Sequence, residues 1–151
     1  LAHHLRLPVG GAIFSSDERK ATETADVLAL RLGREVITDH GFREVDRPDD
    51  WDDDYRALVA RYLAGELIPG WEPQASVVTR FAAAVGRATE QTHDGDTVVV
   101  SHGQAISLYL ASRAALDVVS FWRALTLPDA WSLDLATGEL SRLYETGLPP
   151  E

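Results

Sequence analysis

The sequence of 151 residues contains no cysteine and no methionine. Without cysteine the chain can form no disulfide bond, offers no thiolate nucleophile and builds no zinc site of the cysteine type. It also contains no apolar run of membrane-spanning length and no visible signal peptide. We therefore expect a cytoplasmic protein that has no membrane partner.

Positive charge is scarce as well. The 14 Lys and Arg residues face 24 Asp and Glu residues, which gives a formal net charge of -10. Nucleic acids and anionic membranes favour basic surfaces, so this balance argues against both as nonspecific partners. An anionic ligand would need a local cluster of Lys, Arg or His to overcome the overall field.

The length and composition fit one soluble globular domain over residues 1–151, with 45% hydrophobic and 25% charged residues. The chain begins with Leu1, and LAHHLRL resembles the end of a helix because Leu1, Ala2 and Leu5 are spaced for one face. We therefore expect a further segment upstream of Leu1 in the native protein.

Helical and strand patterns alternate along the rest of the chain, which predicts an α/β fold. The uniformly β-branched run TVVV is typical of a strand buried on both faces of a parallel sheet. The expected strands are residues 12–14, 35–38, 97–100, 130–135 and 139–145, the last two flanking a hairpin turn. The expected helices are residues 17–33, 53–64, 74–92, 104–116 and 117–125.

Ser101-His102-Gly103 joins the predicted strand 97–100 to a helix. Such a turn lies at the carboxyl edge of a parallel sheet, where ligands of open α/β sheets bind. The N–H groups of Gly103 and Gln104 at the start of the helix favour an anion. His102 would stand over this anion site, and the alternative is a turn histidine with a satisfied hydrogen bond. A nucleophilic Ser101 is a further alternative, although V-V-S-H-G lacks the first glycine of the G-x-S-x-G motif.

Two other segments carry candidate groups. Arg19 and Lys20 fall in the first turn of the helix after Ser15-Ser16, where the helix dipole disfavours cations unless an anion is near. On these residues alone, a surface charge pair with Glu23 or Asp17 is the favoured explanation. Glu44 lies in a loop between apolar neighbours, where a partly buried carboxyl group could act as a general acid. The alternative there is a solvated loop acid.

Taken in order, these motifs resemble the histidine phosphatase superfamily, also called phosphoglycerate mutase-like. The resemblance covers nearly the whole chain and implies a three-layer α/β/α fold with a mostly parallel sheet that lacks its N-terminal strand in this sequence. The matching residues are Ser15, Ser16, Lys20, Ala21, Thr24, Ala25, Phe42, Arg43, Glu44, Ser101, His102, Gly103 and Ile106.

The resemblance implies a phosphatase that hydrolyses a small phosphate monoester through a phosphohistidine intermediate. His102 would stabilise the transferring phosphoryl group and Glu44 would protonate the leaving oxygen. Lys20 would bind phosphate as a point charge, and Arg19, one place earlier, would assist it or take its place. The backbone of Gly103 would also bind phosphate. We expect no cofactor and no metal ion, because cations and imidazoles supply the charge stabilisation.

The family's nucleophile motif, Arg-His-Gly, is absent from the 151 residues. The adjacent His3 and His4 fall in the predicted first helix and do not match it, so we expect the nucleophilic histidine upstream of Leu1. The alternative is a noncatalytic member that binds a phosphate ligand or a partner. Residues 47–73 are expected to form a substrate cap that Trp51, Tyr55 and Trp71 could line.

Overall fold

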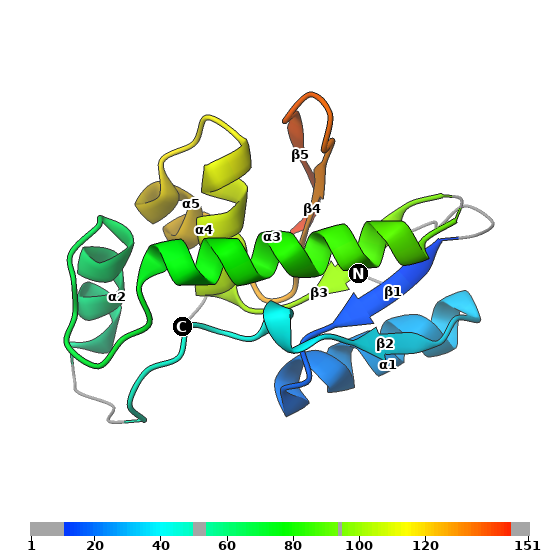
Figure 1. Ribbon diagram of the computed structural model, residues 1–151, viewed down its shortest axis with the longest axis horizontal. Coiled ribbons are helices and arrows are strands. Elements are labelled where there is room, and N and C mark those ends of the chain that lie inside the picture. The colour runs from blue at the N-terminus through cyan, green and yellow to red at the C-terminus, as the bar shows by residue number, and fades with distance from the viewer. Residues whose placement is uncertain (1–10, 50–53, 94, 146–151) are drawn as a thin grey trace.

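The computed structural model describes residues 11–49, 54–93 and 95–145 (Figure 1). The predicted helix at the N-terminal end of the chain lies outside these ranges. In chain order the elements are β1 (Ala12–Ser15), α1 (Arg19–Leu32), β2 (Val36–Thr38), the 3-10 helix η1 (His40–Phe42), α2 (Tyr55–Leu63), α3 (Gln74–Gln91), β3 (Thr97–Val100), α4 (Gly103–Arg113), α5 (Val118–Ala124), β4 (Asp129–Leu133) and β5 (Leu140–Glu145).

A parallel sheet with strand order β2-β1-β3 forms the middle layer of the fold. Helix α1 covers one face, where Leu28 and its neighbours pack around Ile13 of the central strand. Phe14, the next residue of that strand, belongs to the larger apolar cluster on the other face, to which α3 and α4 contribute. Figure 1 shows α1 and α3 on opposite sides of the strands. The α/β fold predicted from the sequence is therefore confirmed.

Strand β3 meets apolar layers on both faces, as predicted, since Val98 packs with the α1 cluster and Val99 with the larger one. All four of its residues are nevertheless only half-buried. Among the described residues, however, β1 is the one strand that pairs with β3. The opposite edge therefore has no described strand beside it, which leaves the β3 side chains partly exposed.

Helix α1 begins two residues later than predicted. Its N-cap residue is Glu18, whose side chain makes no cap hydrogen bond. Ser16 lies two residues before the cap position and accepts a hydrogen bond from the Glu18 N–H at 3.1 Å. Gly33 is the C-cap residue and ends the helix with a left-handed φ of 64°. The late start places Ser16 and Glu18 in the turn at the carboxyl end of β1.

Helix α3 begins at the predicted residue and ends one residue before the predicted end. Phe81 is buried, whereas its neighbour Ala82 is exposed. The buried stripe is Val77, Phe81, Ala84 and Ala88, and it follows the helical period. The Phe81 ring lies 5.1 Å from that of Phe42 and 4.8 Å from that of Tyr109, between centroids. This packing fixes η1 and the loop after it against α3 and α4.

The C-terminal strands β4 and β5 form the predicted antiparallel hairpin, with Gly138 at a φ of 76° in its turn. The hairpin is a two-stranded sheet of its own, separate from the parallel sheet. In the described part of the chain, no helix is both long and apolar enough to cross a membrane.

Candidate active site

The turns after β1 and β3 meet at one edge of the parallel sheet. Ser16 follows β1, and His102 is the N-cap residue of α4, two residues after β3. The His102 Nε2 atom lies 3.0 Å from the Ser16 Oγ atom. Because β1 and β3 are parallel neighbours, their carboxyl ends bring together two turns that lie far apart in sequence. This edge is the position at which the sequence predicted a site.

Glu18 joins these two residues, although sequence analysis did not identify it as a site residue. Its Oε2 atom lies 2.9 Å from the His102 Nε2 atom and 3.5 Å from the Ser16 Oγ atom. The same oxygen accepts a hydrogen bond from the Glu44 N–H at 2.7 Å. A single carboxylate oxygen therefore links the turn after β1, the loop after η1 and the N-terminus of α4.

The Glu44 carboxylate lies at the N-terminus of α4. It accepts hydrogen bonds from the N–H groups of Ala105 at 2.9 Å, Val45 at 3.1 Å and Gln104 at 3.3 Å. A carboxylate here is stabilised by these donors and by the helix dipole. The anion that the helix N-terminus was predicted to bind is thus a side chain of the protein itself. Its donors are Gln104 and Ala105, where the prediction named Gly103 and Gln104.

The side chain of His102 is 8% exposed. Burial lowers the pKa of its imidazole below the ordinary value of 6.5, and the charges of Lys20 and Arg80 act in the same direction. The carboxylates of Glu44 and Glu18 oppose this shift without cancelling it. The charges of Glu44 and Glu18 both act on His102. In the described part of the chain, however, no group of three or more His, Cys, Asp or Glu side chains is arranged to hold a metal ion.

The two cations predicted to bind phosphate differ in their surroundings. Lys20, exposed in the first turn of α1, lies near enough for its charge to act on His102. Arg19 is directed elsewhere: its Nε atom lies 2.6 Å from a Glu23 carboxylate oxygen, and its side chain is 90% exposed. The structure brings Lys20 to the edge of the site and holds Arg19 in a surface ion pair.

Arg80 of α3 supports the loop that carries Glu44. Its guanidinium group donates to the carbonyl oxygens of Gly41, Arg43 and Glu44 at 2.8 to 2.9 Å. It also donates to both carboxylate oxygens of Glu72 at 2.8 Å. The sequence signal for this role was weak, because one arginine on a helix is usually a solvated residue.

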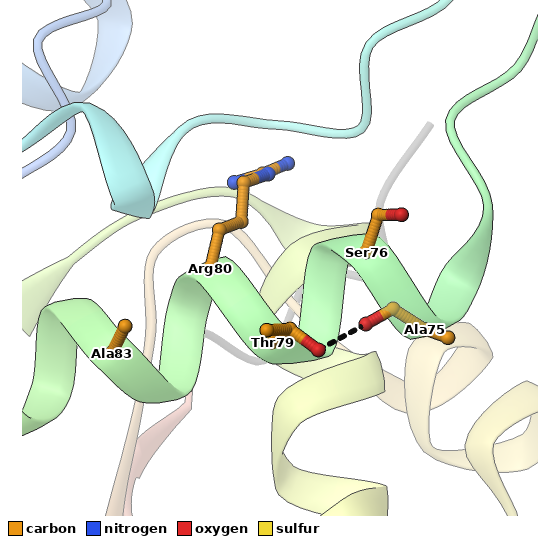
Figure 2. A pocket seen from close by; sticks show the side chains of 5 residues that line it. All are labelled: Ala75, Ser76, Thr79, Arg80 and Ala83. Atoms are coloured by element: carbon orange, nitrogen blue, oxygen red, sulfur yellow. Dashed lines mark hydrogen bonds between the residues drawn. The ribbon is translucent and has the colours of Figure 1, made fainter.

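Figure 2 shows Arg80 beside a surface hollow on α3 whose other lining residues are small: Ala75, Ser76, Thr79 and Ala83. The Thr79 hydroxyl group donates to the Ala75 carbonyl oxygen at 2.7 Å. The Arg80 guanidinium group is already bonded to the loop and to Glu72. Apart from Arg80, the residues that line the hollow carry no charge, so the candidate site is placed at His102 and not here.

The segment predicted to form a substrate cap contacts the N-terminal turn of α4 through Tyr55 of α2. The Tyr55 hydroxyl oxygen accepts a hydrogen bond from the Gln104 Nε2 atom at 2.8 Å. The Arg47 guanidinium group lies over the rings of Tyr55 and Trp71, 4.9 and 5.6 Å from their centroids. Trp51, the third aromatic residue predicted for the cap, lies outside the described residues. Helix α2 thus contacts the first turn of α4, as a cap over the site would.

Ser101 does not have the contacts of a serine nucleophile. Its hydroxyl group donates to the Phe42 carbonyl oxygen at 2.6 Å. Ser16 does contact His102, but Ser16 and Glu18 both approach the same nitrogen, Nε2. In a catalytic triad the serine and the acid bind opposite nitrogens of the imidazole. The geometry therefore gives no support to a serine hydrolase.

Replacing Ser101 by alanine tests this interpretation. Loss of its hydrogen bond to the main chain is expected to lower the free energy of unfolding by about 1 to 2 kcal/mol in urea denaturation. Hydrolysis of an aryl phosphate by the full-length protein should change less than twofold. The control is Ser112→Ala, at an exposed serine at the end of α4. A Ser101→Ala protein that folds but has no activity would support Ser101 as the nucleophile.

Comparison with known proteins agrees with this geometry. The sequence profile of the histidine phosphatase superfamily (branch 1) matches residues 1–139. Phosphoglycerate mutase-like protein 4 of Arabidopsis thaliana is 28% identical over 160 residues, which cover 89% of this chain and 67% of that protein.

Solved structures give the same result. A mycobacterial glucosyl-3-phosphoglycerate phosphatase superposes with a TM-score of 0.61 at 27% identity, over 80% of this chain and 65% of its own. Its complex with inorganic phosphate superposes with a TM-score of 0.55 at 28% identity, over 76% and 63% of the two chains. The chain thus spans less than two thirds of the length of that phosphatase. Since the family profile matches most of its residues, the chain belongs to the histidine phosphatase superfamily.

Proposed function

We propose that this chain supplies the phosphate-binding and proton-transfer groups of a phosphatase that hydrolyses a small phosphate monoester through a phosphohistidine intermediate. The observation that carries the proposal is the meeting of His102, Glu44 and Ser16 at the carboxyl edge of the parallel sheet. Membership of the superfamily supports it, and so does the similarity to a phosphatase whose complex with inorganic phosphate is known.

In the proposed reaction a histidine nitrogen attacks the phosphorus atom and the ester P–O bond breaks. Glu44 gives its proton to the leaving oxygen, and His102 stabilises the charge on the transferring phosphoryl group. Water then attacks the phosphohistidine, Glu44 takes the proton of that water, and inorganic phosphate leaves. Because the 151 residues contain no Arg-His-Gly, the described groups are assigned binding, charge stabilisation and proton transfer, and not nucleophilic attack.

Capture of the substrate depends on local groups in this proposal. The net charge of -10 repels anions over the molecule as a whole. Lys20 supplies a cation at the edge of the site, and its charge already acts on His102. The phosphoryl oxygens would take hydrogen bonds from His102 and from the Gly103 N–H. The α2 segment, which contacts α4 through Tyr55, would cover the rest of the ester.

Glu44→Gln tests proton donation. In the full-length protein this change is expected to lower kcat on the order of 10²-fold or more for an alkyl phosphate, whose leaving oxygen needs a proton. The loss should be much smaller for 4-nitrophenyl phosphate, whose leaving group departs as an anion. Steady-state kinetics with both substrates measure the difference, and Glu90→Gln on the exposed side of α3 is the matched control. Equal losses for the two substrates would contradict proton donation by Glu44.

The second candidate is a noncatalytic member that binds a phosphate ligand. The observation that favours it is the absence of Arg-His-Gly from these residues. Calorimetric binding of inorganic phosphate without turnover of any aryl phosphate by the full-length protein would establish this alternative. Turnover that is lost in a His102 variant would eliminate it.

A further inference from the structure

The carboxylate of Glu18 occupies hydrogen-bond donors that an incoming phosphoryl group would need. Its Oε2 atom lies 2.7 Å from the Glu44 main-chain nitrogen, 2.9 Å from the His102 Nε2 atom and 3.5 Å from the Ser16 Oγ atom. One main-chain N–H group and one imidazole nitrogen within 2.9 Å of a single oxygen make an anion-binding site, and the Ser16 hydroxyl group lies farther off at its edge. In this structure the anion in that site is a side chain of the protein.

The Glu18 side chain can leave this position without movement of the backbone. Its main-chain N–H is held by the Ser16 hydroxyl oxygen at 3.1 Å, which fixes the start of α1. The side chain makes no cap hydrogen bond to the helix, and a third of its surface is exposed. Rotation about its side-chain bonds therefore takes the carboxylate into solvent and leaves the turn after β1 intact.

We propose that Glu18 is an internal anion that competes with phosphate for His102 and for the main-chain N–H of Glu44, and thereby sets the affinity of the site for phosphoryl groups. The inference rests on the proposed function to the extent that a phosphoryl group is the ligand. In this scheme, a phosphoryl group that binds displaces the Glu18 carboxylate from His102. At the end of the reaction the carboxylate returns to His102 and displaces the inorganic phosphate.

The charges around the site make this competition strong. Glu44, the second carboxylate beside His102, is held by the N-terminus of α4 and stays in place. Of the cations whose charge acts on His102, Arg80 is already bonded to Glu72 and to the loop, whereas Lys20 is exposed. A phosphate ion that enters while Glu18 is in the site would face the Glu18 carboxylate, and the repulsion from this carboxylate ends when Glu18 rotates out.

Removal of the Glu18 charge is therefore expected to tighten phosphate binding. Isothermal titration of the full-length protein with inorganic phosphate measures the effect in the wild type and in Glu18→Gln. We expect a Kd about tenfold lower in the variant, since loss of one nearby like charge has effects of this order. Glu18→Ala, which also empties the position, should bind phosphate at least as tightly as Glu18→Gln.

The matched control is Glu23→Gln, which removes the same charge from α1 at an exposed residue paired with Arg19. Its phosphate affinity should stay within twofold of the wild type, which separates direct competition from a general change of charge. Unchanged affinity in both Glu18 variants, together with loss of binding in His102→Ala, would overturn the competition and leave the proposed function standing. Absence of phosphate binding in every one of these proteins, including the wild type, would overturn both.

Discussion

His102→Ala is expected to lower kcat/KM of the full-length protein for an aryl phosphate by on the order of 10²- to 10³-fold, the cost of removing one donor aimed at developing charge. His102 is positioned for this role by its place at the N-terminus of α4 and by its contact with Ser16. At 8% exposure its imidazole acts in surroundings from which most water is excluded, where such a donor stabilises charge more than it would in water.

The matched control for this prediction is His40→Ala. The His40 side chain is 73% exposed and pairs with Asp17. Because it contacts none of His102, Glu18 and Glu44 in this pair, removal of the His40 imidazole should change kcat/KM less than twofold. Circular dichroism and thermal unfolding establish that both variants fold. Because the imidazole of His102 also contacts Ser16 and Glu18, His102→Gln, which keeps a side-chain donor, should lose less activity than His102→Ala. Full activity of a folded His102→Ala protein would contradict the proposed role.

The parts of the fold set by local pattern could be predicted from the sequence. The parallel strands and their helices follow from short apolar runs that alternate with helical spacing. The meeting of His102 and Glu44 could also be anticipated, because each follows an element that ends at the same edge of the sheet and because the order of the motifs matches a known family. The burial of Phe42 and Val45 beside Glu44 agrees with their apolar character.

Other features depend on contacts across the sequence that no local pattern specifies. Glu18 is one of several acids near the start of α1, and its role arises from contacts with Glu44 and His102, 26 and 84 residues away along the chain. The α4 N-terminus has the sequence of an anion site, but the sequence does not say that the anion is Glu44. The half-burial of β3 likewise depends on which strands pair with it, and not on its own composition.

Arg80 also acts through contacts with residues far away along the chain. Of the substitutions proposed for this protein, Arg80→Ala is expected to lower the free energy of unfolding most. Arg80→Ala should lower the free energy of unfolding at neutral pH by about 3 kcal/mol, because it removes two hydrogen bonds to the partly buried Glu72 carboxylate and one to each of three loop carbonyl groups. The two side chains are 23% and 16% exposed, so water can replace only part of the lost bonding. Urea denaturation followed by tryptophan fluorescence measures the change.

The pH dependence of this loss gives a second measurement. Burial acts to raise the pKa of Glu72, but hydrogen bonds from Arg80 and from the Asp46 N–H outweigh it, so the pKa is lower than the ordinary value of 4.5. A carboxyl group with a lowered folded-state pKa stabilises the protein above its unfolded-state pKa, and that contribution is lost as the pH falls through the lowered value. The difference between wild type and Arg80→Ala should therefore be largest at neutral pH and shrink in acid.

Two further variants separate the ion pair from the support of the loop. Glu72→Gln removes the charge of the partner but leaves Arg80 bonded to the carbonyl groups of Gly41, Arg43 and Glu44. A double-mutant cycle of the two changes then isolates the coupling between the charges. Arg87→Ala breaks a more exposed pair on the same helix, with Asp39, and should cost about 1 kcal/mol or less. If Arg80→Ala costs no more than Arg87→Ala, the loop that carries Glu44 is held by the packing of Phe42 and Phe81, and not by Arg80.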